Sequence, residues 1–396
     1  MLKTLPKIFK AIYPFSDFLY ILQLEEYDTK RYFKRLKYFF FRRALQRRGT
    51  LLYTTRTKIT LLLAAPLGLI SPPLVPIWIG VSNSALSPFF DFFKYILQKR
   101  AAKYFKQKNK KTKVIAIAGS YGKTTVKNYI YELIKYNYKT QMVPGNINTP
   151  TGIANWILSD FNSDSEIVIV EVDSYYAGEI KKSLAITPPD IAILTNIDDQ
   201  HLERFRTRKN LREALTEVFK NAKKEAVKIK NKKTNLDYAL EAARVLKIPS
   251  DIVKHTVKNL AVPERRGNQI QINGFEVIDN SYNISLTTAK VEILNAKGRA
   301  EKNKKHLLVI TAGIPELGEE NKNGNIILGG ILDKNANVVF LLQSILHSDV
   351  EAGIKNKKKI VHAKSMKDAL NKLTDFNPEK YLVLMQPELN DLYYSA

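Results

Sequence analysis

Residues 114–125 read Val114-Ile-Ala-Ile-Ala-Gly119-Ser-Tyr-Gly122-Lys-Thr-Thr125, and this stretch decides the fold. Its first five residues are apolar or small, which predicts a buried strand. The glycines predict a turn, and an amphipathic helix pattern begins at Val126. A strand, a glycine turn and a helix N-terminus form a phosphate-binding geometry. Glycines let the backbone approach an anion, and the free N–H groups of the first helical turn point at it.

Within this loop each polar residue type suits a nucleotide. We expect Lys123 to reach the β- and γ-phosphates and the Thr124 hydroxyl to bind Mg²⁺. The common pattern G-x-x-x-x-G-K-[ST] is not fully met, because Ile117 stands at its first glycine position. The alternative is a chance turn with a solvated lysine. The position between a strand and a helix favours nucleotide binding.

Composition narrows the possible partners and chemistries. The chain has 396 residues, a net charge of +25 and a pI near 9.7, which indicates an anionic partner such as a nucleotide, anionic lipid or nucleic acid. It has no cysteine, which excludes disulfides, thiolate catalysis and Cys-ligated zinc. With five histidines, a multi-His metal site is not expected.

Residues 1–108 predict a helical, membrane-associated region. Thr29–Lys58 carries eleven Lys or Arg and no acid, and aromatic residues are interleaved with them. Ile59–Phe90 then runs for thirty-two residues without a charge, longer than the ~20 apolar residues that a membrane span needs. Its prolines predict a kinked span or a re-entrant hairpin around Ser71-Pro72-Pro73. Basic flanks on both sides favour two cytoplasmic ends.

The apolar run predicts attachment to the cytoplasmic face of the cell membrane, with an anionic membrane surface as partner. A buried hairpin of a soluble protein is the alternative. Basic residues alternating with aromatics in residues 1–58 are also compatible with nucleic-acid binding, but the apolar run that follows argues against nucleic acid as the partner.

An α/β pattern follows the charged passage Lys103–Lys113, which we interpret as a linker. Strand-like runs alternate with helical segments and predict a doubly wound, mainly parallel sheet in a central domain at residues 109–260. Pro263–Gly267 reads as a boundary turn. A smaller, Rossmann-like α/β domain is expected at residues 261–396. The predicted strands are Val114–Ala118, Gln141–Val143, Glu166–Val172 and Ile191–Thr195, then Phe275–Ile278, His306–Thr311, Val338–Leu342, Lys359–His362 and Tyr381–Met385.

Acids are expected close to the phosphate loop. The apolar strand Ile167–Val170 delivers Glu171 and then Asp173 at its carboxyl end, where open α/β sheets bind ligands. The next strand is followed by His201, which by itself is more typical of a structural or exposed residue.

Several short motifs occur together in a fixed order, and they resemble the Mur ligase family, most of all its MurF branch. The resemblance covers roughly residues 110–396. The motifs are Gly119–Thr125, Gly145-Asn-Ile-Asn148 with Gly152, Glu171 with Gly178-Glu-Ile180, Thr195-Asn-Ile197 with His201-Leu-Glu203 and Phe205, Asp279-Asn-Ser-Tyr-Asn283, and Pro315-Glu-Leu-Gly-Glu319.

The resemblance implies an ATP-dependent ligase that joins a cell-wall precursor, UDP- or lipid-linked, to an amino acid or dipeptide through an acyl phosphate. ATP and Mg²⁺ are the implied cofactors. The implied roles are as follows: Gly119, Ser120, Gly122, Lys123, Thr124 and Thr125 hold the phosphates; Thr124, Glu171 and His201 hold magnesium; Lys123, His201 and Arg265 are catalytic; Asp279 and Asn280 lie near the ribose; and Asn146 and Asn148 line the substrate side.

The sequence also departs from the family. Leu215 stands where the family has a lysine that becomes carbamylated for the second Mg²⁺, and Glu213 or Glu217 is a candidate to compensate. The ribose pair has Asn280 as its second member, without charge. The central domain is shortened, and the membrane segment replaces the domain that grips the UDP-sugar.

Three other functions remain beside the ligase. A non-catalytic ATP-binding scaffold or regulatory partner is favoured by Leu215 and by the shortened central domain. A generic P-loop kinase or transport ATPase is disfavoured by the motifs after residue 260. Nucleic-acid binding by residues 1–58 comes last.

Overall fold

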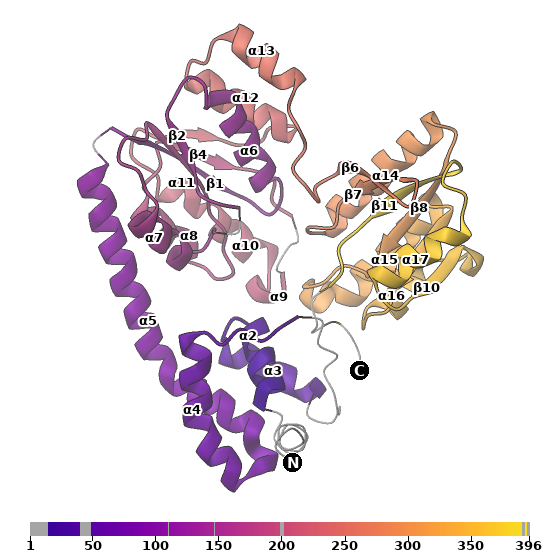
Figure 1. Ribbon diagram of the computed structural model, residues 1–396, viewed down its shortest axis with the longest axis horizontal. Helices are drawn as coiled ribbons and strands as arrows, with labels where there is room; N and C mark the ends of the chain where they lie inside the picture. Colours follow the sequence, from indigo (N-terminus) through magenta and orange to yellow (C-terminus); the bar gives the residue numbers. More distant parts are fainter. Residues whose placement is uncertain are drawn as a thin grey trace. The chain divides into compact units, whose positions relative to one another are not determined.

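The computed structural model describes residues 15–39, 49–109, 111–145, 147–198, 202–389 and 393. The chain divides into two compact units, residues 1–95 together with 389–396, and residues 96–388. Figure 1 labels their helices and strands. The three domains expected from the sequence, with boundaries near residues 108 and 260, stay a prediction. The two compact units have different boundaries and do not test them.

The first unit is helical where it is described. It contains α2 (Phe15–Leu24), α3 (Thr29–Phe39), α4 (Thr55–Ile70), the short 3₁₀ turn η1 (Pro72–Leu74) and the beginning of α5 (Val75–Lys108). The chain reverses at Ser71, where two consecutive prolines supply no backbone N–H and end the helical ladder. The Ser71 hydroxyl donates to the Leu67 carbonyl and accepts a 2.7 Å hydrogen bond from Trp78 Nε1. The expected break around Ser71-Pro72-Pro73 is therefore present.

Side-chain hydrogen bonds connect α2 and α3 to the helical hairpin that α4, η1 and the beginning of α5 form. The Tyr32 hydroxyl donates to the Pro76 carbonyl at 2.8 Å. The Asn83 amide donates to the Tyr27 carbonyl and the Thr29 hydroxyl, and accepts from Arg56 Nε at 3.0 Å. None of the described helices is both long enough and apolar enough to cross a membrane.

The second unit begins with a five-stranded parallel sheet in the order β2-β3-β1-β4-β5. Its strands are β1 (Lys113–Ala118), β2 (Thr140–Met142), β3 (Ile167–Glu171), β4 (Ile191–Leu194) and β5 (Val227–Ile229). Its helices are α6 (Lys123–Ile134), α7 (Pro150–Ser159), α8 (Glu179–Ile186), α9 (Leu202–Phe205), α10 (Arg208–Leu215), α11 (Glu217–Lys220), α12 (Asn235–Val245) and α13 (Ser250–Lys258).

Both faces of this sheet are buried, which suits its continuous apolar strands. Side chains of α6 and α12 pack on one face, against the odd-numbered residues of β1. Side chains of α7, α8, α10 and the end of α5 pack on the other face, against the even-numbered ones. The parallel strands bring their carboxyl ends to one edge, where the phosphate loop leaves β1.

A six-stranded mixed sheet follows in the order β10-β9-β8-β11-β7-β6. Its strands are β6 (Asn268–Ile272), β7 (Phe275–Asp279), β8 (His306–Thr311), β9 (Val338–Leu342), β10 (Ile360–Ala363) and β11 (Tyr381–Met385). The longer helices around it are α14 (Leu286–Lys302), α15 (Asn321–Asn335), α16 (His347–Gly353) and α17 (Met366–Lys372). Only β6 runs antiparallel among the described strands, paired with β7.

The α/β architecture and all nine predicted strands are confirmed, with bounds that agree or differ by one residue at either end. One prediction fails, and two strands were not predicted. The expected linker at Lys103–Lys113 is wrong, because α5 continues to Lys108 and buries Ala101 and Phe105. The sequence also gave no prediction for β5 and β6, two edge strands that carry exposed polar side chains.

Candidate functional site

The phosphate loop leaves β1 in a conformation that glycine favours. Gly119 has φ of 143° and Gly122 has φ of 84°, both in the region that side chains disfavour. A Cβ on Gly119 would lie 2.0 Å from the Thr195 hydroxyl oxygen, and one on Gly122 would lie 2.4 Å from Asn235 Oδ1. The loop backbone therefore packs against neighbouring side chains at both glycines.

The segment after β4 holds the loop in place. The Ser120 N–H donates to the Asn196 carbonyl at 2.9 Å, and the Thr195 hydroxyl donates to the Tyr121 carbonyl at 2.7 Å. The Ser120 hydroxyl also lies 3.0 Å from both the N–H and the carbonyl of Asp198. These bonds fix the path of the backbone before α6 begins at Lys123.

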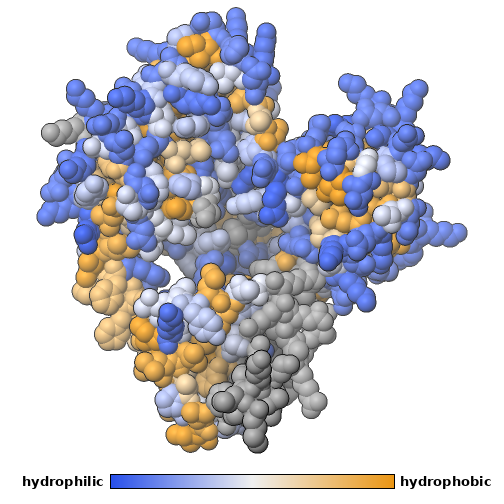
Figure 2. Space-filling model, viewed as in Figure 1, coloured by the Kyte–Doolittle hydropathy of each residue, from blue (hydrophilic) through white to orange (hydrophobic). Residues whose placement is uncertain are grey.

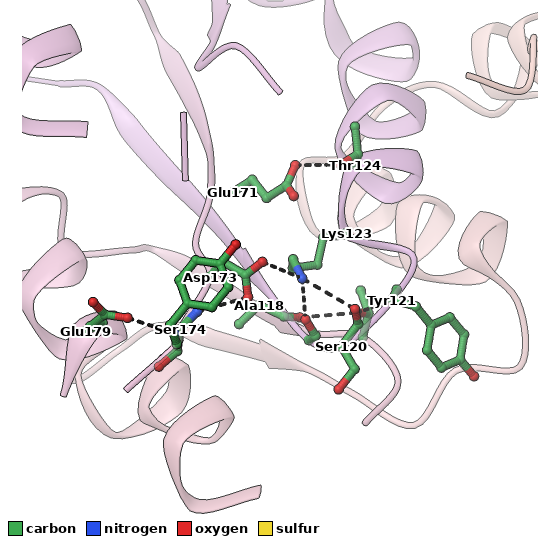
Figure 3. A network of polar contacts seen from close by, with 12 residues as sticks. Ala118, Ser120, Tyr121, Lys123, Thr124, Glu171, Asp173, Ser174 and Glu179 are labelled. Carbon is green, nitrogen blue, oxygen red and sulfur yellow. Dashed lines mark hydrogen bonds and ion pairs between the residues drawn. The ribbon is translucent and has the colours of Figure 1, made fainter. Parts of the chain in front are cut away.

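The end of β3 supplies the acids that the sequence predicts. The Thr124 hydroxyl donates to Glu171 Oε2 at 2.8 Å (Figure 3). Lys127 Nζ lies 3.1 Å from the same oxygen. Lys127 is buried, which lowers its pKa, while the Glu171 charge opposes that shift. Thr124 and Glu171 thus form a pair of oxygen groups of the type that Mg²⁺ binds.

The Lys123 side chain folds back over the phosphate loop. Its Nζ donates to the Gly119 carbonyl at 2.6 Å and lies 3.1 Å from Asp173 Oδ2 (Figure 3). Asp173 is itself fixed, because its other oxygen accepts from the Ser174 N–H and its own N–H donates to the Asn148 carbonyl. The expected acid Asp173 therefore lies beside the phosphate loop, in contact with Lys123.

A cleft of about 230 Å³ opens beside the loop within the second unit. Its walls come from the loop, from the end of β3 and from the segments flanking β6 and β7. The predicted residues that line it are Ser120, Gly122, Lys123, Thr124, Thr125, Asn148, Glu171, Arg265 and Asn280. The structure therefore brings most of the predicted site together.

The two residues predicted near the ribose differ in position. Asn280 lines the cleft, whereas Asp279 is buried and accepts a hydrogen bond from the Ser281 N–H at 3.0 Å. Arg265 adopts φ of 60° and donates to the Ser281 hydroxyl and carbonyl at 3.0 and 2.9 Å. Its guanidinium is thereby held on the cleft wall.

The sequence missed two further residues of this wall. Arg266 stacks on Tyr282, with 3.7 Å from the guanidinium carbon to the ring centroid. Glu292, on α14, has a carboxylate whose burial raises its pKa to about 8. Its Oε2 has no hydrogen-bond partner among the described residues. Helical spacing from Ser285 and Thr288 could have indicated that Glu292 shares their face.

Two predicted residues, Asn146 and His201, lie outside the described residues. Within the described part of the chain, no three His, Asp or Glu side chains come together as a metal site. The suggested substitutes for the missing lysine do not fit. Glu217 caps α8, accepting from the N–H groups of Gly178 and Lys181 at 2.9 and 3.0 Å, and Leu215 is packed in the apolar core. Glu213 is exposed.

Fold and cleft together define a phosphate-loop α/β protein with two sheets. Residues 117–297 match the Mur ligase middle domain. This part of the chain is therefore similar to the middle domain of the Mur ligases.

Two curated relatives illustrate the likeness. The UDP-N-acetylmuramoyl-tripeptide–D-alanyl-D-alanine ligase of Rickettsia prowazekii is 36% identical over 139 residues, which are 35% of this chain and 30% of the relative. The enzyme of the same name from Borreliella burgdorferi is 28% identical over 263 residues, 63% of this chain and 55% of the relative. The matches thus span about a third to a half of these relatives.

Among solved structures, the MurF ligase of Thermotoga maritima in complex with ADP aligns with a TM-score of 0.65 at 22% identity. The alignment covers 74% of this chain and 80% of that one. A MurF from Acinetobacter baumannii aligns with a TM-score of 0.64 at 18% identity, covering 74% and 77%. At these identities the likeness shows a shared fold.

Proposed function

We propose that this chain is a MurF-like, ATP-dependent amide ligase of cell-wall precursor synthesis. One observation carries the proposal: a single cleft collects Lys123 and Thr124 of the phosphate loop together with Arg265 and Asn280. The curated relatives that match are ligases by name, which favours catalysis over the scaffold role that Leu215 suggested.

The reaction has two steps. A carboxylate oxygen of the precursor attacks the γ-phosphorus of ATP, the bond to the β,γ-bridging oxygen breaks, and ADP and an acyl phosphate result. An amine nitrogen then attacks the acyl carbon, an amide forms, and phosphate and a proton leave. The protein's task is positioning and charge neutralisation, which Lys123, the loop N–H groups and Arg265 would perform.

Magnesium fits the two oxygen groups where the first turn of α6 meets the end of β3. The Thr124 hydroxyl and Glu171 carboxylate lie 2.8 Å apart on the cleft wall and are hard oxygen ligands. The bound ion would neutralise phosphate charge. The role proposed for His201 in a second magnesium site rests on the resemblance alone.

Loss of the phosphate-loop lysine tests the assignment. We expect Lys123→Ala to abolish ADP formation, whereas Lys139→Ala, which removes the same charge from an exposed position, should leave it unchanged. Equal turnover in both variants would refute the role of Lys123. The acceptor is proposed to be a UDP- or lipid-linked precursor carrying a carboxylate, and the amine an amino acid or dipeptide.

We also propose that the helical hairpin attaches the chain to the cytoplasmic face of a membrane without crossing it. Its support is a group of exposed apolar side chains along α4, η1 and α5 (Figure 2). They include Leu62 (71% exposed), Leu69 (51%) and Ile70 (83%). Exposed Lys58 and Lys94 on the same helices suit anionic headgroups.

Sedimentation of the full chain with phosphatidylglycerol–phosphatidylcholine vesicles tests this attachment. Each buried leucine or isoleucine contributes about 1.5–3 kcal/mol, so Leu62→Ser with Ile70→Ser should weaken binding at least tenfold. Ile327→Ser, which removes an exposed isoleucine from α15, is the control. Absence of vesicle binding, or self-association through this face, would contradict the proposal.

A further inference from the structure

Both lysines in the first two turns of α6 form buried ion pairs. Lys123 Nζ lies 3.1 Å from Asp173 Oδ2 (Figure 3). Lys127 Nζ lies 3.1 Å from Glu171 Oε2. The four side chains are all mostly buried, with exposures of 8% and 13% in the first pair and 1% and 4% in the second. Each lysine charge near the loop is therefore already balanced by an acid from the end of β3.

The donors of Lys123 are also occupied. An ammonium group has three donors, and those of Lys123 meet the Gly119 carbonyl, the Asp173 carboxylate and, at 3.5 Å, the Ser120 carbonyl. A phosphate oxygen that binds this Nζ must replace one of these partners. It must also approach the Asp173 carboxylate, since that group is within hydrogen-bond distance of the same nitrogen. The phosphate and the Asp173 carboxylate, both negatively charged, would then lie close together at a poorly solvated position.

The two pairs differ in what a ligand can reach. Glu171 Oε2 is held by both the Thr124 hydroxyl and Lys127, and Lys127 is further held by the Val143 carbonyl at 3.1 Å. Asp173 has only Lys123 as a charged partner in the described contacts. Lys123 and Asp173 both line the cleft, whereas in the other pair Glu171 lines it and Lys127 does not. The Lys123–Asp173 pair is the one that an incoming phosphate meets.

We propose that Asp173 is a positioning residue that makes the loop select the magnesium complex of a nucleoside triphosphate over the metal-free anion. Without ligand, Asp173 holds Lys123 against the loop. A divalent cation arriving with the phosphates supplies positive charge that offsets the Asp173 carboxylate, so Lys123 can turn to a phosphate oxygen. Metal-free triphosphate lacks that compensation and is repelled. This inference rests on the proposed nucleotide binding and adds a residue that determines its selectivity.

Calorimetric titration of the full chain with ATP, once with excess Mg²⁺ and once with a chelator, tests the inference. For the unsubstituted protein we expect binding at least ten times tighter with Mg²⁺. Asp173→Asn should tighten metal-free binding about tenfold, the equivalent of ~1.4 kcal/mol, and so bring the ratio of the two affinities close to one. Asp173→Ser, which removes the charge with a smaller side chain, should act alike. Asp164→Asn, an exposed acid, should leave the ratio unchanged.

The outcomes separate this inference from the function on which it rests. An unchanged affinity ratio in both Asp173 variants would overturn the selector role while leaving nucleotide binding intact. Equal weakening with and without Mg²⁺ would also overturn it, because Asp173 would then only shape the loop. Absence of nucleotide binding by the unsubstituted protein would overturn the proposed function itself and the selector role with it.

Discussion

The Thr124 hydroxyl donates a 2.8 Å hydrogen bond to Glu171 Oε2, joining the first turn of α6 to the end of β3. Parallel pairing of β1 with β3 brings these residues together across forty-seven positions of sequence. The sequence predicted that both residues bind magnesium, because each belongs to one of two separate motifs. Their contact shows that the fold brings these two oxygen groups together beside the phosphate loop.

Removal of the Thr124 hydroxyl should raise the Mg²⁺ concentration needed for ATP binding. Thr124→Ala deletes one oxygen ligand, and we expect the half-saturating Mg²⁺ concentration to rise about tenfold. Thr124→Ser keeps the hydroxyl and should restore the original value. Titration of Mg²⁺ at fixed ATP, followed by nucleotide fluorescence, measures both. Matching Mg²⁺ dependence in the alanine and serine variants would count against a ligand role.

The Lys127–Glu171 pair should matter for stability. Lys127→Met removes one partner and leaves a carboxylate buried without its counter-charge, which costs about 3–5 kcal/mol. Lys135→Met is the control: this half-buried lysine at the C-cap of the same helix pairs with the more exposed Glu132, and its loss should change the free energy of unfolding by under about 1 kcal/mol. Urea unfolding gives both values, and similar values for the two variants would show that the buried pair contributes little.

Restoring the family lysine at position 215 should destabilise the protein instead of completing a metal site. Leu215 is 1% exposed and packs with the helices on one face of the first sheet. A lysine buried there loses several pKa units, so Leu215→Lys should cost about 4 kcal/mol at pH 7. Leu215→Met conserves volume and should cost under about 1.5 kcal/mol. A stable lysine variant with raised activity would show that position 215 reaches the reaction centre.

The buried carboxyl of Glu292 predicts a pH dependence of stability. Its pKa is raised to about 8 by burial, so between its ordinary value of 4.5 and pH 8 the folded protein holds a proton that the unfolded chain has lost. The free energy of unfolding therefore falls as pH rises through this window, by at most about 1.4 kcal/mol per unit. Glu292→Gln should flatten that slope. Thermal unfolding from pH 5 to 8 checks it, and parallel slopes in both proteins would contradict the assignment.

Sequence reasoning predicted every interior strand and the edge strands β2 and β10, but it missed the edge strands β5 and β6. β1, β3 and β8 are apolar runs, because helices cover both faces of each sheet. By contrast, Val227-Lys-Ile229 and Asn268-Gln-Ile-Gln-Ile272 leave polar side chains exposed at sheet edges, where apolar periodicity fades. Lys103, Lys106 and Lys108, which contributed to the linker prediction, lie on α5, whose Ala101 and Phe105 are buried in the core.

The candidate site was predictable where a motif fixes a local conformation. Gly119 and Gly122 occupy backbone angles that glycine favours, so the loop could be inferred from sequence. Asp173 was noticed as an acid at a strand end, but its pairing with Lys123 depends on side-chain placement across β1 and β3. Arg266, just before β6, and Glu292, on α14, line the cleft from elements around the second sheet. Neither residue belongs to a short motif that would have predicted its place in the site.

The central claim is that this chain forms an amide from a carboxylate and an amine at the expense of ATP. ADP release by the purified full chain with MgATP measures it most directly, using UDP-linked and lipid-linked muramoyl peptides, each with and without D-alanyl-D-alanine. The account predicts that ADP appears only when a carboxylate acceptor and an amine are both present, and disappears in Lys123→Ala. Binding of MgATP without ADP from any acceptor–amine pair would contradict it.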